Sequence, residues 1–233
     1  MRVRIKLYRD SQFLIREFDV EPGPNHTILD VLFYLKENQD PTLSFRSMCR
    51  SGICGTCSVK VNGNAVLACK TKVGSFTEPI LIEPIDNLPV IKDLVVEHKS
   101  LFERLRRLKV WYEPLNYNLQ AYRTNPLVDK SFKCIACGLC DSSCPVFLTN
   151  PDFAGPMALS RAYKISQDPR NSKREEVLLR IRDGKIELCT HCKNCSMVCP
   201  MAVMPETIIK FEESELLKRG LLFPPTPNGF DFF

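Results

Sequence analysis

Hydrophobic and polar residues alternate along the first twenty positions, which predicts two half-buried β-strands. Val3, Ile5 and Leu7 alternate with charged or polar neighbours, and this period of two is typical of a strand with one buried face. After Asp10-Ser11, the alternation continues through the segment FLIREFDVE. The chain therefore begins with two predicted strands joined by a short turn.

The pattern next changes to that of an α-helix in the segment PNHTILDVLFYLKENQD. Thr27 is followed three residues later by Asp30, which resembles a capping box, and apolar residues from Ile28 to Leu35 form one helical face. Further along, Asn62-Gly63 predicts a hairpin with a type I′ turn, and EPILIEP predicts another short strand. This order of elements is typical of the β-grasp fold.

From Val95 onward, the apolar residues recur at helical spacing. The predicted helices are LFERLRRLKVW, GPMALSRAYKIS, REEVLLRIRDG and PETIIKFEESELLKRG. The last begins with Pro205 and ends at Gly220, as helix termini prefer, while the arginines around the first indicate a solvated face. YEPLNYNLQAYRTNP reads as an irregular linker. The predicted class is α+β, with a β-grasp domain at residues 1–96 and a helical domain at residues 97–233.

Length, hydrophobicity and charge exclude several classes of protein. The 233 residues are enough for two modest domains, and no apolar run reaches the roughly 20 residues that span a bilayer. The first residues lack a secretory signal, so we expect a cytoplasmic protein that attaches to the cytoplasmic face of a membrane through partner subunits. A net charge of +5 suits an acidic partner surface but is low for a nucleic-acid binder.

The twelve cysteines point to metal ligation, because cytosolic thiols are kept reduced. The first group has the spacing C-x4-C-x2-C with a fourth member after the hairpin, which matches a plant-type [2Fe–2S] site. Gly52 and Gly55 let this loop turn tightly and aim N–H groups at sulfur. A zinc ion held by four thiolates is the alternative. The predicted ligands are Cys49, Cys54, Cys57 and Cys69.

Two later runs, CIACGLCDSSCP and CTHCKNCSMVCP, share the pattern C-x2-C-x2-C-x3-C-P of two-cluster ferredoxins. In such pairs, the fourth cysteine of each run serves the other cluster. One predicted [4Fe–4S] set is therefore Cys134, Cys137, Cys140 and Cys199. The distal set is Cys144, Cys189, Cys192 and Cys195.

Other residues near these runs have simpler interpretations. Pro145 and Pro200 suit the start or end of helices. His191, between two predicted ligands, reads as a solvent-facing or hydrogen-bonding residue. No nucleophile–base pair stands out, so no catalytic residue is assigned. Three clusters in one chain predict an electron relay whose substrate site lies on another subunit.

The three cysteine motifs in this order, with the following segment NPDFAGPMALSRAYKISQDPRN, resemble the iron–sulfur subunits of succinate dehydrogenases and fumarate reductases. The resemblance covers about residues 1–212. It implies a flavoprotein partner whose FAD interconverts succinate and fumarate, and a membrane-associated partner, quinone-reactive or cysteine-rich, beyond the distal cluster. It favours neither direction of catalysis.

Two departures from that family occur where it meets quinone. Its common members hold a [3Fe–4S] centre with the equivalents of Cys144, Cys189 and Cys195 and have no cysteine at the position of Cys192. Here Cys192 predicts a [4Fe–4S] centre, with a free thiol beside [3Fe–4S] as the alternative. The family's tryptophan-rich segment is VFLTN here, and Trp111 is the one tryptophan of the chain. These departures resemble the branch with a cysteine-rich third subunit.

Two other functions stay open from the sequence. A free-standing multi-cluster carrier is one, although carriers tend to be smaller, acidic and without an apolar tail such as LLFPPTPNGFDFF. We expect this tail to fold back over the helical domain. An iron–sulfur subunit of a thiol- or heterodisulfide-linked fumarate reductase is the other.

Overall fold

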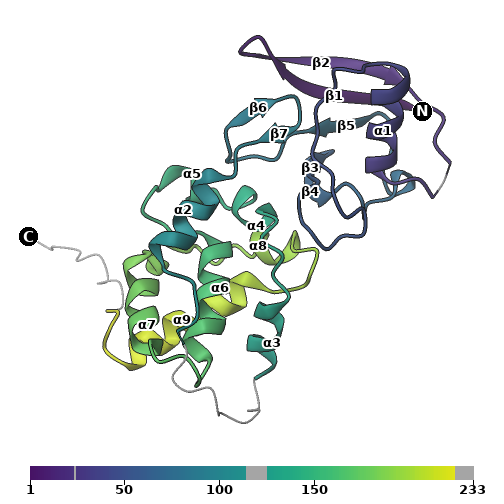
Figure 1. The fold of residues 1–233 in the computed structure, drawn as a ribbon. Coiled ribbons are helices and arrows are strands. Elements are labelled where there is room, and N and C mark those ends of the chain that lie inside the picture. The colour runs from purple at the N-terminus through teal and green to yellow at the C-terminus, as the bar shows by residue number, and fades with distance from the viewer. Residues whose placement is uncertain (24, 114–124, 224–233) are drawn as a thin grey trace, which may run out of the picture.

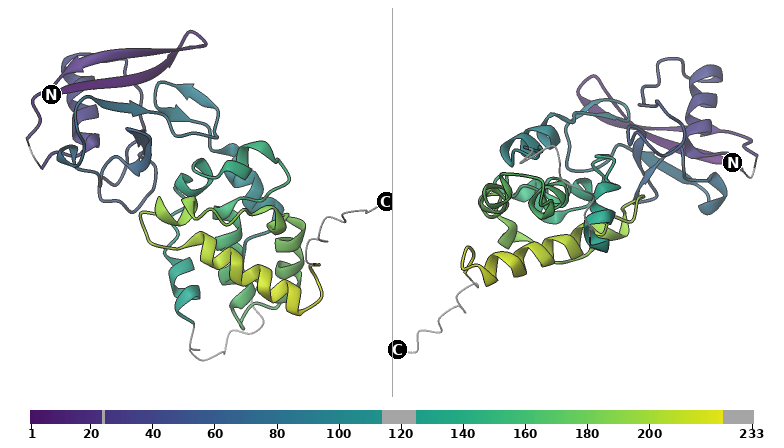
Figure 2. Two further views of the ribbon diagram at one scale, coloured as in Figure 1. Left: turned by 180° about the vertical axis from the view of Figure 1, so that it is seen from behind. Right: turned by 60° about the horizontal axis from the view of Figure 1, so that its bottom comes forward.

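The computed structural model describes residues 1–23, 25–113 and 125–223. The central part of the predicted linker and the tail from residue 224 lie outside these ranges. Figure 1 shows a sheet-containing part that begins with the N-terminus and a helical part beside it, and Figure 2 shows the same division from two other sides. The predicted α+β class is confirmed. The boundary between residues 96 and 97 stays a prediction.

The five-stranded sheet has the order β2-β1-β5-β3-β4. Its strands are β1 (Arg2–Arg9), β2 (Gln12–Asp19), β3 (Ser58–Val61), β4 (Asn64–Leu67) and β5 (Ile80–Glu83). The β1–β2 and β3–β4 pairs are antiparallel, and β5 runs parallel to β1. The alternation in β1 buries Val3, Ile5 and Leu7 completely, as a strand with one core face requires.

Helix α1 (Ile28–Asn38) supplies the second layer of this part, and its capping box forms as predicted. The backbone N–H of Asp30 donates to Thr27 Oγ1 at 3.2 Å, and that of Thr27 donates to Asp30 Oδ2 at 2.8 Å. Both bonds satisfy N–H groups that the first helical turn leaves without partners. The apolar face of α1 joins the same core as the sheet.

The predicted hairpin joins β3 and β4 through Asn62 and Gly63. Both residues have positive φ, 45° and 82°, which is the geometry of a type I′ turn. A second, two-stranded sheet of β6 (Val90–Lys92) and β7 (Val95–Val96) was not predicted. It follows β5 and leads into the first helix of the helical part (Figure 1).

The helical part contains the four predicted long helices and several short ones. The helices are α2 (Lys99–Arg107), α3 (Pro126–Phe132), α4 (Leu139–Ser142), α5 (Pro145–Thr149), α6 (Pro156–Gln167), α7 (Arg174–Asp183), α8 (Asn194–Met197) and α9 (Pro205–Lys218). Single 3-10 turns occur at η1 (Val73–Ser75) and η2 (Ile186–Leu188). Helix α9 lies along α6 and also contacts α7 (Figure 1). No helix in the described ranges is long and apolar enough to cross a membrane.

The prediction of a solvated basic face on α2 is wrong for Arg104, which is half-buried, whereas Arg107 is exposed as predicted and still bonds to a neighbouring loop. Arg104 donates to the carbonyls of Phe153 (2.6 Å) and Phe147 (3.2 Å), and it stacks on the Phe147 ring. Arg107 donates to the carbonyl of Asp152 at 2.6 Å. These carbonyls lie at the end of α5 and in the loop after it, where a helix leaves acceptors free. The two arginines therefore fasten α2 to the segment that follows Cys144.

The helix termini follow the predicted residues. Pro145 begins α5, and Pro205 begins α9. Gly220, at φ 65°, follows the end of α9, as glycine commonly does. Pro200 lies in the turn after α8, so it follows the end of a helix and begins none. Beyond Gly220, the side chains of residues 221 and 222 pack against the core, while Phe223 is exposed.

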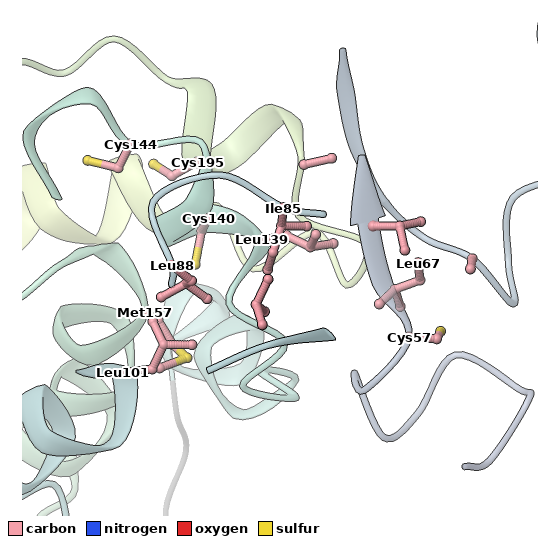
Figure 3. Packing of buried hydrophobic residues seen from close by; sticks show 14 of the residues in the cluster. Cys57, Leu67, Ile85, Leu88, Leu101, Leu139, Cys140, Cys144, Met157 and Cys195 are labelled. Atoms are coloured by element: carbon pink, nitrogen blue, oxygen red, sulfur yellow. The ribbon is translucent and has the colours of Figure 1, made fainter. Parts of the chain in front are cut away.

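One hydrophobic core extends through both parts of the molecule. It includes residues of the sheet, such as Leu67, and residues of the helical part, such as Leu101 and Met157. Figure 3 shows some of these side chains, with Ile85 and Leu139 between Leu67 on the sheet side and Leu101 and Met157 on the helical side. The continuity fixes the cysteine loops of one part relative to those of the other.

Candidate iron–sulfur cluster sites

The loop between Cys49 and Cys57 wraps its first sulfur in backbone N–H groups. Cys49 Sγ accepts hydrogen bonds from the N–H groups of Ser51 (3.4 Å), Ile53 (3.4 Å) and Cys54 (3.3 Å). These donors, Ser51 foremost, lower the pKa of Cys49 to about 5. Donors aimed at sulfur stabilise a thiolate, which is the form that binds iron.

The β3–β4 hairpin returns the chain to this loop. The N–H of Ala68 donates to the carbonyl of Cys57 at 2.9 Å, so Cys69 lies beside Cys57, with Cys54 close by. Burial raises the pKa of Cys57 to about 11, although the N–H of Cys69 opposes the shift. The four predicted [2Fe–2S] residues are thus gathered by one loop and one hairpin.

A first cavity in the helical part is lined by the four cysteines predicted for the upstream [4Fe–4S] centre. Three precede or lie on α4, and the fourth follows α8. They are Cys134, Cys137, Cys140 and Cys199. The rest of the lining is mostly apolar and includes Met157 and Val203. A dry, sulfur-lined cavity suits a cluster whose potential depends on burial and hydrogen bonding.

A second cavity is lined by the distal set. It comprises Cys144, Cys189, Cys192 and Cys195. Cys144 and Cys195 are buried, whereas Cys192 is exposed, and Figure 3 shows the first two close together near α4 and α8. Lys193 and Glu206 also line this cavity. The structure therefore brings Cys192 to the distal set, at its solvent side.

The crossing of the fourth cysteines follows from the packing of α4 against α8. Each is a four-residue helix preceded by a residue with positive φ, Gly138 at 76° and Lys193 at 66°. Each carries the third cysteine of its run and ends shortly before the fourth. Because the two short helices lie side by side (Figure 1), the chain beyond each one reaches the cavity of the other.

Burial raises the pKa of most thiols in these two cavities. The pKa rises to about 12 for Cys137 and Cys195 and to about 11 for Cys189, and it rises well above the ordinary value for Cys140. Such thiols give up their protons to bound metal, since ligation stabilises the thiolate directly. Among the described residues, no three Cys, His, Asp or Glu side chains converge closely enough to hold a single metal ion. The donor chemistry and the two cavities fit polynuclear clusters.

His191 is a hydrogen-bonding residue, the second of its two predicted interpretations. Its Nε2 lies 2.8 Å from Glu213 Oε2, and its Nδ1 lies 3.4 Å from Glu206 Oε1 without hydrogen-bond geometry. Both glutamates belong to α9. His191 therefore ties the loop of Cys189 and Cys192 to the longest helix.

Sequence reasoning missed two polar groups near the cavities. Asp141 lies between two predicted ligands, is fully buried and accepts the N–H of Met157 at 2.9 Å. Burial raises its pKa to about 7, against the effects of that N–H and of Arg104. Asn87 donates to the carbonyls of Asp141 (3.1 Å), Ser142 (2.8 Å) and Cys144 (2.9 Å). Asp141 could have been identified from its position inside a run of predicted ligands. No feature of the sequence pointed to Asn87.

Glu212 on α9 is a second buried acid, and it gives a prediction about pH. Its side chain is completely buried, and neither carboxylate oxygen has a hydrogen-bond partner among the described residues. Burial, with Glu215 and Glu213 nearby, raises its pKa well above 4.5. A raised pKa means that the folded chain keeps the proton after the unfolded chain has lost it. The stability that Glu212 contributes is therefore fully present below pH 4.5, and it is lost as the pH rises toward the pKa of the folded chain.

Glu212→Gln is expected to raise the thermal unfolding midpoint of the cluster-loaded chain, by an amount that grows from mildly acidic to mildly alkaline buffer. The gain is about 1.4 kcal/mol for each unit by which burial raises the pKa, because glutamine stays neutral at every pH. Glu37→Gln, on the exposed side of α1, is the control. The prediction would be contradicted if the difference in unfolding midpoint between Glu212→Gln and the parent chain did not change with pH.

Two family models match the two parts of the chain. A model described as a 2Fe-2S iron-sulfur cluster binding domain matches residues 2–103, and one described as a 4Fe-4S dicluster domain matches residues 130–203. The predicted [2Fe–2S] and [4Fe–4S] domains are thus confirmed. The individual ligands, Cys192 included, stay predictions.

Several relatives match over most of the chain. The fumarate reductase iron-sulfur subunit of Mycobacterium tuberculosis is 37% identical, with 92% of each chain covered. The mitochondrial succinate dehydrogenase [ubiquinone] iron-sulfur subunit 3 of Arabidopsis thaliana is 34% identical, covering 95% of this chain and 78% of that protein. A chain of the Mycobacterium smegmatis Sdh1 complex in the apo form superposes with a TM-score of 0.82 at 27% identity, covering 94% of this chain and 95% of that one. The chain belongs to the family of iron–sulfur subunits of succinate dehydrogenases and fumarate reductases.

Proposed function

We propose that this chain carries electrons between the FAD of a flavoprotein partner and a second, membrane-associated partner. One observation carries the proposal: eight cysteines from two separate runs line two cavities, four in each, with one cysteine of every set taken from the other run. Four thiolates around a polynuclear centre are the ligand set of a [4Fe–4S] cluster. The loop of Cys49, Cys54, Cys57 and Cys69 supplies the corresponding set for [2Fe–2S].

The order of the three sites supports a relay. The [2Fe–2S] loop meets the upstream run, since Ser58 Oγ lies 3.1 Å from the carbonyl of Cys137. The upstream and distal sites share the segment from Cys140 to Cys144 and the contact of α4 with α8. Iron–sulfur clusters exchange single electrons, and a series of them lets an electron cross a distance that one transfer could not.

The partners follow from what the chain contains and from its family. We infer that the succinate or fumarate site and its FAD belong to a flavoprotein that docks beside the [2Fe–2S] loop. The distal site, with the exposed Cys192, faces either a quinone-reactive membrane subunit or a cysteine-rich one. Attachment to the cytoplasmic face of the membrane through these subunits is part of the proposal.

Affinity purification of the tagged chain from its own cells, under anaerobic conditions, tests the function. We expect an FAD-bearing protein to accompany it, and the complex to reduce an artificial dye with succinate or to oxidise a reduced dye with fumarate. A chain that elutes alone with its clusters loaded would favour the free-standing carrier and overturn the proposal. Fumarate reduction that works with thiols and fails with dyes would point to the thiol-linked type.

A further inference from the structure

The [2Fe–2S] loop touches the ligand loop of the upstream site at Gly55. A β-carbon on Gly55 would lie 2.8 Å from Cys137 Cβ, 3.0 Å from Cys137 Cα and 3.1 Å from the carbonyl oxygen of Ile135. The first distance is shorter than real β-carbons adopt, and the other two are tighter than most, so the neighbouring backbone would have to shift. Any side chain at position 55 would therefore separate the two loops.

Two polar side chains hold the same contact closed. Ser58, which is buried, places its hydroxyl 3.1 Å from the carbonyls of both Gly55 and Cys137. At the C-terminal end of α4, Asn87 donates to the carbonyls of Asp141, Ser142 and Cys144. The contact is thus fixed by hydrogen bonds from the sheet part to the backbone of the helical part, and α4 cannot slide along it without breaking them.

Because of where Gly55 lies in the chain, this contact joins the ligand loops of two neighbouring clusters. Gly55 stands between Cys54 and Cys57, two predicted [2Fe–2S] ligands, and it abuts the backbone of Cys137, a predicted [4Fe–4S] ligand. Electron transfer weakens exponentially with distance, and it passes more readily along bonded and touching atoms than across a gap. The contact of Gly55 with Cys137 is therefore one direct van der Waals route between the two ligand loops.

We propose that Gly55 is a positioning residue that sets the approach of the [2Fe–2S] and upstream [4Fe–4S] centres, and with it the rate of electron transfer between them. This inference rests on the proposed function and its ligand sets. A single electron leaves one reduced centre and reduces the other, and no bond or proton changes place.

The simpler explanation is that glycine at position 55 only provides a positive φ, here 72°. Gly63 separates the two explanations, because its φ is 82° and a β-carbon there would have no atom within 4 Å. Gly63→Ala imposes the same kind of backbone strain in the same part of the molecule without closing on a neighbour. Ser58→Ala does the reverse, since it loosens the contact with Cys137 and strains no backbone angle.

The test uses the purified complex and electron paramagnetic resonance of the reduced clusters. A neighbouring paramagnetic cluster speeds the spin relaxation of [2Fe–2S], and this effect falls steeply with distance. We expect Gly55→Ala to weaken the relaxation enhancement severalfold and to slow electron transfer from [2Fe–2S] to the same degree. Ser58→Ala should act in the same direction more weakly, and Gly63→Ala should match the parent complex.

Unchanged relaxation in Gly55→Ala with all clusters loaded would overturn the inference. If that variant fails to assemble [2Fe–2S], Ser58→Ala decides alone, and unchanged relaxation there also overturns it. The proposed function is judged separately on the unmodified complex, by its FAD, its iron content and its succinate or fumarate activity.

Discussion

Replacing Cys192 with alanine is expected to turn the distal centre into a three-iron cluster. In the proposed ligand set, the thiolate of Cys192 holds the one iron on the solvent side, because its three companions are buried or half-buried and Cys192 is exposed. Without that thiolate, the corner iron loses its only protein ligand and dissociates, while Cys144, Cys189 and Cys195 retain the other three. The anaerobically purified parent chain should contain about ten irons and the variant about nine.

The change is also visible without counting iron. An oxidised three-iron cluster is paramagnetic, whereas an oxidised [4Fe–4S] cluster is silent, so the variant should show a new signal in the oxidised state. The distal potential should become more positive, since cluster type and net charge set it. Thr190→Ala, which alters the same loop and cavity lining, is the control and should keep about ten irons. A parent chain that already holds about nine irons with the three-iron signal would show that Cys192 is a free thiol.

The sequence predicts most of the sheet part because local signals there agree with one another. The alternation in β1, the capping box at Thr27 and the turn at Asn62-Gly63 each specify a geometry that tertiary packing preserves. Helix α3 was missed although Asn125 and Pro126 form a clear start, with the Asn125 side chain accepting two N–H groups. Its seven residues are too few for helical periodicity to stand out.

Some features of the candidate sites could likewise be predicted from local sequence, and others could not. Cysteine spacing predicts the two cavity sets, because each run places its third cysteine on a short helix and its fourth just beyond that helix. Contacts between distant segments carry no such signal. Asn87, Ser58 and the arginines of α2 act on backbone carbonyls, and any segment offers carbonyls. The close approach at Gly55 likewise depends on a neighbour 82 residues away along the chain, Cys137.

Removing the fourth cysteine of one run is expected to abolish the cluster formed mainly by the other run. In the chain that already carries Cys192→Ala, the distal centre is marked by its oxidised three-iron signal. Adding Cys199→Ala should remove the reduced [4Fe–4S] signal and leave the three-iron signal intact, because Cys199 lines the upstream cavity. Adding Cys144→Ala should do the opposite, because Cys144 lines the distal cavity. Each replacement leaves a cluster short of one of its protein ligands, and in the upstream cavity the rest of the lining is mostly apolar.

Iron content alone does not show whether the fourth cysteines cross, because either replacement removes several irons from the chain. The signal that survives in each variant shows which cluster was lost. If the four cysteines of each run served a single cluster, Cys199→Ala would remove the three-iron signal and Cys144→Ala would spare it. Ser142→Ala and Ser196→Ala, which change neighbours of the ligands on α4 and α8, control for damage to the short helices and should retain both signals. Because α4 and α8 lie against each other, we expect the crossed result: each short helix carries a ligand for one cluster and directs the chain to the other.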